Sequence, residues 1–311
     1  MKTRYCPVCN NHQSHTVMRF TPEQISKANP TYDRDKLKEA LKDKDRFLTY
    51  SRCDACGMIF CKYIWDDDTL EQIYAITISH NKSREKIYAI DKRLALINTW
   101  NNILRLLKLR GKKQLNGVKI IDFGSGWGDF LDVAAGSGIQ SMGYDQDKEK
   151  LAFSKKNGHQ VAEDLEQLEN FGPVDIFIMN SVLEHVQNVQ DVFDFVHRVL
   201  KPDGILVFSV MDYRGKFIEK NSARVMKGQL ALTKNFNPVE HVNIYNYQAV
   251  CSTLVANGFR LLSTRHVLYL TDFYGVKNSS NAIRILNWAE KALSHVLTGK
   301  DIGIQVYAAR Q

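Results

Sequence analysis

The sequence predicts an α/β fold with a small cysteine-bearing unit in front of it. From residue 117 onward, short apolar runs alternate with amphipathic runs, which is the pattern of repeated βαβ units. Such units form a mainly parallel sheet with helices on both faces. Before residue 66, four of the six cysteines form two Cys-x-x-Cys pairs. We therefore expect a cysteine-bearing unit over 1–65, a helical linker or cap over 66–114, and the α/β domain over 115–311.

Each element is predicted by its own run of residues. Strands are expected at 118–122, 139–145, 159–164, 174–180 and 204–210, with helices in the intervals between them. Further elements are a helix near 246–257, a strand within 259–270, a helix near 280–296 and a last strand within 302–309. In the linker, Asp68 and Glu71 have the spacing of a helix start. Apolar residues then recur at steps of three and four over 87–107, which predicts a helix that packs on the α/β domain.

The composition is that of a globular protein with an uneven charge. Of the 311 residues, 44% are hydrophobic and 24% are charged. No apolar run approaches the roughly 18 residues that span a bilayer, and the N-terminal stretch has no apolar export signal, so we expect a cytoplasmic protein. Residues 1–116 hold 22 Lys and Arg against 13 Asp and Glu, whereas the remainder holds 20 against 21. A basic half can indicate an anionic partner, such as nucleic acid, a nucleotide-sugar or a phosphorylated glycan, or can serve solubility alone.

The cysteine pairs predict a structural zinc site rather than disulfides. Cys6 and Cys9 form the first pair, and Cys53 and Cys56 form the second. In a long chain without an export signal, such pairs favour metal binding. Four thiolates give a closed tetrahedral zinc site with no open position for catalysis. The 43 residues between the pairs form a charge-dense insert that is longer than in the usual ribbon, and the spare ligands that could replace one cysteine are Cys61, His12 and His15.

The stretch IIDFGSGWGDF (120–130) predicts a nucleotide-binding turn. Gly124, Gly126 and Gly128 follow an apolar strand at alternate positions, which differs from the G-x-G-x-x-G spacing of dinucleotide-binding folds. Asp122 ends that strand, and its charge would oppose a pyrophosphate at the next helix N-terminus. A cationic ligand would tolerate this charge. No Gly-Lys-Ser/Thr sequence follows, so the turn is not a P-loop.

Polar residues also follow the other predicted strands. Asp145, with Gln146 beside it, ends the second strand 21 residues after the first glycine, where a carboxylate can accept hydrogen bonds from both ribose hydroxyls. Glu163 and Asp164 follow the third strand, where a side chain can meet an adenine amino group. The segment NSVLEH (180–185) follows the fourth strand. Because open α/β sheets bind ligands beyond the carboxyl ends of their strands, we expect these residues to share one crevice.

The segments IIDFGSGWGDF, GYD, AED, NSVLEHV and LKPDGILVFSV resemble, in order, the motifs of class I S-adenosylmethionine-dependent methyltransferases. The resemblance covers roughly residues 115–311. It implies a Rossmann-like seven-stranded sheet of order 3-2-1-4-5-7-6, with strand 7 antiparallel, and S-adenosylmethionine as methyl donor. By the family pattern, Gly124, Ser125 and Gly126 pass under the methionine part, Asp145 holds the ribose, Asp164 and Leu165 hold the adenine, and Asn180 and Ser181 line the sulfonium side. Asp122, Gly128 and Gln146 complete the expected donor site.

Two histidines compete as the general base on the acceptor side. Methyl transfer from a sulfonium requires alignment of nucleophile, methyl and sulfur, and a hydroxyl nucleophile also benefits from a base of near-neutral pKa. The segment VEHVNIYNYQAV resembles part of a methyltransferase subfamily that acts on sugars and other small molecules. We expect His241 to be the base, Glu240 to orient it, and His185 to be a wall residue or the alternative base. The long segment 211–239, with its Lys and Arg side chains, could meet an anionic substrate. Asp212 and Tyr213, directly after the strand at 204–210, are candidate substrate contacts.

A zinc unit in front of this type of domain resembles the sugar C-methyltransferases and their relatives in glycan gene sets. The expected acceptor is therefore a hydroxyl or carbon of a nucleotide-sugar or glycan, although the long charged insert departs from that pattern. An RNA methyltransferase, holding RNA with its ribbon and basic half, is the alternative. Against it, the fourth strand ends in NSVLEH rather than Asn/Asp-Pro-Pro-aromatic, and few aromatics interleave the basic residues of the insert. A donor-binding scaffold without activity is a third interpretation.

Overall fold

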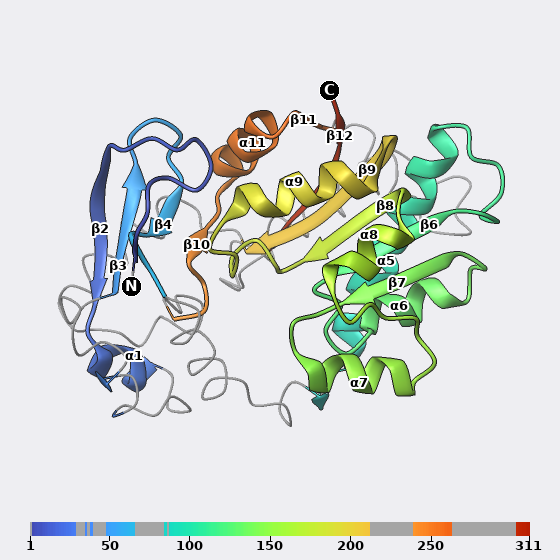
Figure 1. Cartoon of the computed structure of the whole chain (residues 1–311), viewed down its shortest axis with the longest axis horizontal. Helices are drawn as coiled ribbons and strands as arrows, with labels where there is room; N and C mark the ends of the chain where they lie inside the picture. Colours follow the sequence, from blue (N-terminus) through green and yellow to red (C-terminus); the bar gives the residue numbers. More distant parts are fainter. Residues whose placement is uncertain are drawn as a thin grey trace, which may run out of the picture.

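The computed structural model describes residues 2–28, 35, 38–39, 48–65, 84–85, 87–211, 239–262 and 303–311. In this part of the chain, a small antiparallel sheet stands beside a larger mixed sheet that is flanked by helices (Figure 1). Several predictions fall outside the described residues: the helix that begins at Asp68, the segment 212–238 with Asp212 and Tyr213, the helix near 280–296, and most of the charged insert.

The larger sheet confirms the predicted alternation of strands and helices. Its strands are β6 (Lys119–Phe123), β7 (Gln140–Tyr144), β8 (Val174–Asn180), β9 (Leu200–Met211), β11 (Phe259–Leu261) and β12 (Gly303–Arg310), in the order β11-β12-β9-β8-β6-β7. The strands β7, β6, β8 and β9 run parallel, whereas β12 pairs antiparallel with both β9 and β11. The carboxyl ends of four parallel strands therefore meet at one edge, which is where open α/β sheets bind ligands.

The seven-stranded sheet implied by the resemblance is not confirmed, because the described residues form six strands. The segment 159–164 contributes one isolated parallel bridge, between Val161 and Gly143. Two hydrogen bonds flank the bridge, from Gly143 N to the Gln160 carbonyl and from Ala162 N to the Gly143 carbonyl. Ala162 is the one buried residue of this segment. It offers too little apolar surface to extend the pairing, and Asp164 turns the chain into the next helix.

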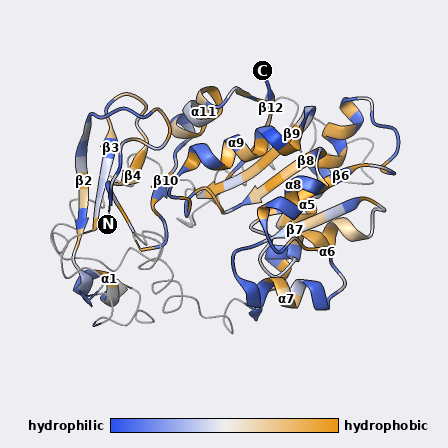
Figure 2. Cartoon of the chain, viewed as in Figure 1, coloured by the Kyte–Doolittle hydropathy of each residue, from blue (hydrophilic) through white to orange (hydrophobic). Residues whose placement is uncertain are grey.

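Helices cover both faces of the larger sheet, as predicted. Helix α5 (Ile90–Leu109) buries Trp100 and Ile103 on the face that carries Ile176 of β8. Helix α9 (Val189–Val199) packs on the opposite face, which carries Phe177, because successive strand residues point to opposite sides. Figure 2 shows the central strand β8 as largely hydrophobic and the helix α7 (Lys148–Lys156) as largely hydrophilic. The remaining helices are α6 (Asp129–Ala135), α7 (Lys148–Lys156), α8 (Leu165–Phe171) and α11 (Tyr247–Ala256).

The small sheet combines N-terminal strands with one strand that lies much later in the sequence. Its N-terminal strands β2 (Ser14–Phe20), β3 (Leu48–Cys53) and β4 (Ile59–Cys61) are antiparallel. The helix α1 (Pro22–Ala28) follows β2. A separate two-stranded sheet is formed by β1 (Lys2–Thr3) and β5 (Tyr63–Ile64). A fourth strand, β10 (Asn243–Ile244), comes from the predicted α/β domain and pairs with β4. Residues on both sides of the expected boundaries therefore share one sheet.

Among the helices that the structure describes, none combines the length and the apolar character needed to cross a membrane.

Candidate functional site

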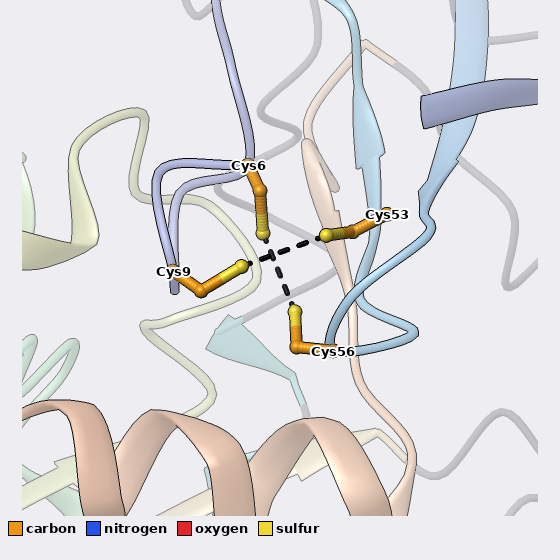
Figure 3. A group of neighbouring side chains, drawn as sticks. All are labelled: Cys6, Cys9, Cys53 and Cys56. Carbon is orange, nitrogen blue, oxygen red and sulfur yellow. Dashed lines mark hydrogen bonds between the residues drawn. The ribbon is translucent and has the colours of Figure 1, made fainter. Parts of the chain in front are cut away.

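Four thiols converge in the N-terminal unit (Figure 3). Cys6 and Cys9 lie on the turn after β1, whereas Cys53 and Cys56 lie at the turn between β3 and β4. The Sγ atoms of Cys6 and Cys56 are 3.4 Å apart, those of Cys9 and Cys53 are 3.5 Å apart, and all four lie within 4.8 Å of one another. Zinc–sulfur bonds of about 2.3 Å would place tetrahedral thiolates about 3.8 Å apart. The geometry is therefore compatible with a shared zinc ion.

The two Cys-x-x-Cys turns have matching backbone geometry. Asn10 and Gly57, which follow the two pairs, have φ angles of 54° and 72°. Their N–H groups donate to the carbonyls of Cys6 and Cys53, at 2.9 and 3.0 Å. Left-handed backbone of this kind suits Gly and Asn. The spare ligands lie outside the cluster: His12 stacks on Tyr5, His15 bonds to Asp54, and Cys61 lies in β4.

The glycine turn after β6 folds tightly against the end of β7. The N–H groups of Gly124 and Ser125 both donate to the Tyr144 carbonyl, at 2.7 and 2.9 Å. The Gly126 N–H donates to Oδ2 of Asp145 at 2.8 Å. The predicted glycine motif and the predicted strand-end carboxylate are thus brought together by direct hydrogen bonds.

Glycine is required in this turn for two reasons. Gly124, Gly126 and Gly128 have φ angles of 76°, 57° and 87°, which L side chains rarely adopt. A Cβ at Gly124 would also lie 2.5 Å from Cγ2 of Val182, in the loop after β8, and one at Gly128 would lie 2.6 Å from Oγ of Ser154. The turn therefore touches the loop that carries the NSVLEH segment.

Asp145 does not cap the helix that follows it. Asp147 does so, accepting from the N–H groups of Glu149 and Lys150 at the start of α7. Asp145 instead accepts from Gly126 N on one oxygen and from Asp147 N, at 2.9 Å, on the other. Its carboxylate spans the glycine turn and the loop after β7, and Gln146 is exposed beside it.

Asp122 is a buried carboxyl at the end of β6, with 3% of its surface exposed. Burial raises its pKa to about 7, and the charges of Asp145 and Asp129 add to the rise. Asp129 is itself paired with Lys92, at 2.6 Å between Oδ2 and Nζ. A nearby cation would favour the ionised form of Asp122, so this carboxyl suits a positively charged ligand.

The start of α8 carries the pair predicted to meet an adenine. Oδ1 of Asp164 accepts from Gln167 N at 2.8 Å, so this carboxylate caps the helix. Leu165 follows with 43% of its surface exposed. An exposed apolar side chain at a strand-end crevice can pack on a planar ring.

Two buried side-chain oxygen atoms near the carboxyl edge of the larger sheet have no hydrogen-bond partner among the described residues. They are Oδ1 of Asn180, at the end of β8, and Oγ of Ser125 in the glycine turn. Ser181 follows with a φ of 53° and donates its N–H to the Ser209 carbonyl at 3.0 Å. Because buried polar groups are almost always satisfied, these two oxygens point to a bound polar ligand.

His185 and His241 meet, although they are far apart in the sequence. Their ring centroids are 4.8 Å apart at an interplanar angle of 70°, and Nδ1 of His185 lies 3.1 Å from the Glu240 carbonyl. Burial, followed by the neighbouring His241, lowers the pKa of His185 to about 3, so its ring is neutral. One ligand atom from each of these three residues lies within 4.8 Å of the others, so the cluster could also share a cation.

Glu184 lies beside His185 but is not among the predicted site residues. Its side chain is 2% exposed, its Oε2 has no partner among the described residues, and burial raises its pKa to about 7. Its position before His185 in NSVLEH could have drawn attention to it. Arg4 and Asn243 also reach this region, and an isolated arginine or asparagine carries no comparable signal.

Comparisons with known proteins agree with the predicted type of domain. The family described as "Methyltransferase domain" matches residues 91–264. A malonyl-(acyl-carrier protein) O-methyltransferase 2 of Ilyobacter polytropus is 28% identical over 112 residues, which is 36% of this chain and 40% of that protein. A ubiquinone biosynthesis O-methyltransferase of Thiobacillus denitrificans is 28% identical over 124 residues, 37% of this chain and 53% of that protein. The chain thus spans about half or less of these curated relatives.

A solved structure is also similar to part of this chain. The magnesium protoporphyrin IX methyltransferase of Synechocystis, bound to SAH, is 17% identical with a TM-score of 0.46, and the match covers 79% of this chain and 100% of that one. The family match is the finding that assigns this chain, because it extends over more than half of the 311 residues. The protein therefore belongs to the methyltransferase domain family.

Proposed function

We propose that this protein transfers a methyl group from S-adenosylmethionine to a small molecule held beside His185 and His241. The observation that carries the proposal is the contact between two loops at the carboxyl edge of the sheet. The glycine turn approaches Val182 so closely that no side chain fits at Gly124. The loop of Val182 continues directly to His185. The family match supports methyl transfer as the reaction class.

The donor fits the residues at the strand ends. S-adenosylmethionine supplies, when bound, a methyl group on a positively charged sulfur. The unpaired oxygens of Ser125 and Asn180 are suited to its polar groups, and the carboxyl of Asp122 would favour its charge. The other residues proposed to hold it are Gly124, Gly126, Gly128, Asp145, Gln146, Asp164, Leu165 and Ser181.

His241 is the proposed general base for an acceptor hydroxyl. Proton transfer is most efficient when the base has a pKa near the operating pH. The lowered pKa of His185 makes that ring a weak base, which supports the assignment of the base to His241. His185 then forms a neutral wall of the acceptor pocket, and Glu240 orients His241.

Donor binding tests the proposal most directly. The affinity for S-adenosylhomocysteine, measured by calorimetry, should fall at least about tenfold in Asp145→Ala, because ribose hydrogen bonds to a charged group are lost. Glu169→Ala is the matched control, since Glu169 is exposed and pairs with Arg198 at the surface. An affinity that Asp145→Ala leaves unchanged would argue against this donor site.

The proposed acceptor is a hydroxyl or carbon of a sugar, in a nucleotide-sugar or a glycan. Support comes from the resemblance of the segment around His241 to sugar and small-molecule methyltransferases, and the two curated relatives are named as O-methyltransferases. A panel of nucleotide-sugars with radiolabelled donor tests the class. Methyl transfer to RNA but to no member of the panel would favour the RNA alternative.

The four thiols are proposed to hold a structural zinc ion.

A further inference from the structure

Arg4 lies at the junction of the two sheets. Its Nε donates to the Cys61 carbonyl at 2.8 Å, its Nη1 donates to the Gln187 carbonyl at 2.6 Å, and its Nη2 donates to the Val242 carbonyl at 2.6 Å and to Oδ1 of Asn243 at 2.9 Å. Desolvation lowers the pKa of the guanidinium to about 10, so it stays charged at neutral pH. Charge-assisted hydrogen bonds of this kind are among the stronger ones in proteins.

The segments that Arg4 joins carry both histidines of the acceptor side. Gln187 follows His185 by two residues in the loop between β8 and α9, and Val242 follows His241 directly. The third partner, Cys61, belongs to the N-terminal unit, where its N–H donates to the Val242 carbonyl at 2.8 Å. One guanidinium therefore connects the cysteine-bearing unit to each histidine-bearing segment.

Asn243 makes further hydrogen bonds at the same junction, to the segment that contains His185. Its Nδ2 donates to the carbonyls of Leu183 and Val186, at 2.8 and 2.6 Å, and its backbone N–H donates to the Glu184 carbonyl at 3.0 Å. These three carbonyls bracket His185 in the chain. Asn243 is fully buried and belongs to β10, which runs from the small sheet toward the larger one (Figure 1).

Tyr50 makes a second connection, to His241 itself. The tyrosine lies in β3, its side chain is fully buried, and its Oη donates to the His241 carbonyl. Its ring packs edge-on against Phe20 at a centroid distance of 6.0 Å. The small sheet thus contacts the backbone of His241 directly.

We infer that the cysteine-bearing unit sets the position of the acceptor-side histidines, with Arg4 and Tyr50 as its positioning residues. The inference rests on the proposed function, in which His185 and His241 face the acceptor. The two histidines lie on separate loops, so their spacing depends on contacts made by their backbones. A misplacement of about 1 Å at a reacting group can cost on the order of a hundredfold in rate.

Two variants test this role. Tyr50→Phe keeps the buried ring but removes the donor to His241, and Arg4→Gln removes the multiple donors at the junction. We expect kcat to fall about fivefold in Tyr50→Phe and about a hundredfold in Arg4→Gln. Affinity for S-adenosylhomocysteine and zinc content should stay within twofold of the wild type. Arg19→Gln is the matched control, because Arg19 is exposed on β2 of the same unit.

A second readout does not depend on activity. The imidazole ring signals of His185 and His241 in NMR spectra should shift in both variants, whereas those of His197, which bonds to the Asn257 carbonyl elsewhere, should stay in place. Unchanged His185 and His241 signals in Tyr50→Phe would overturn the inference, as would a loss of kcat that only follows the loss of folded protein. If the wild type transfers no methyl group, the proposed function fails and the ring signals still decide the positioning role.

Discussion

At the residue scale, the neutral ring of His185 makes the neighbouring His241 the better candidate base. His185 is neutral because burial lowers its pKa to about 3. His241→Ala should reduce turnover at least about a hundredfold if His241 is the base, because a positioned base contributes that much or more. Steady-state kinetics with the acceptor and calorimetry with S-adenosylhomocysteine would separate turnover from donor binding. His185→Asn should cost less, and near-normal turnover of His241→Ala would contradict the assignment.

Asp122 allows a second prediction, on stability. Its pKa rises from 3.8 to about 7 on folding, so between these values the folded protein binds a proton that the unfolded chain has released. The free energy of unfolding therefore falls as the pH rises through that window. At about pH 8, Asp122→Asn should be more stable than the wild type by on the order of 2 kcal/mol, yet bind the donor more weakly.

Denaturant unfolding at about pH 5 and about pH 8 would measure this effect. The exposed Asp191, at the start of α9, provides the control variant Asp191→Asn. A wild-type protein more stable than Asp122→Asn at the higher pH would show that the carboxylate is stabilised by contacts other than the donor.

Local motifs made most of the site predictable at this scale. The glycines, Asp145 and the four cysteines each lie in short patterns whose geometry is set within a few residues, and the structure brings them together as those patterns indicate. The approach of His185 to His241 depends on pairing between distant segments. No local pattern encodes that pairing, so both histidines could be predicted as candidate site residues, but the contact between them could not.

At the element scale, the cysteine cluster joins the β1 turn to the β3–β4 turn, and β4 pairs with β10. Loss of the proposed zinc ion should therefore affect the acceptor-side segment that includes β10. Cys53→Ser should abolish binding of the single zinc equivalent, measured by elemental analysis, and should raise amide exchange at Asn243 and Ile244 of β10. Cys251→Ser, in α11, is the control, and this variant should retain the zinc content of the wild type. Full zinc content in Cys53→Ser would contradict the four-thiolate site.

Secondary structure was predictable where periodicity and capping agree. The starts of α7, α8, α9 and α11 are each capped by an Asp or Asn side chain. The expected third strand of the larger sheet was not confirmed, because its segment buries a single residue. The two-residue strand β10 carries no periodicity of its own, so only its long-range pairing with β4 defines it.

At the scale of the whole molecule, β10 and Arg4 join the two sheets, so the N-terminal unit contacts both histidine-bearing segments. Arg4, one of its cations, donates to protein carbonyls on all the contacts described above. The Arg4 guanidinium is therefore not available to a polyanion, and any RNA binding would depend on other basic residues of this unit.

A salt series distinguishes the two acceptor classes. Binding to RNA that neutralises several phosphates should weaken steeply with added salt, since released counterions drive it. For a small anionic acceptor we expect a shallow dependence between about 50 and 200 mM salt, because few charges are paired, and no RNA affinity in the micromolar range. Fluorescence anisotropy with a labelled single-stranded RNA, beside acceptor kinetics over the same salt range, makes the comparison. Micromolar RNA binding with a steep salt slope, reduced by charge-removing variants of exposed N-terminal residues such as Arg19 and Lys27, would overturn the small-molecule proposal and leave methyl transfer to RNA as the function of this fold.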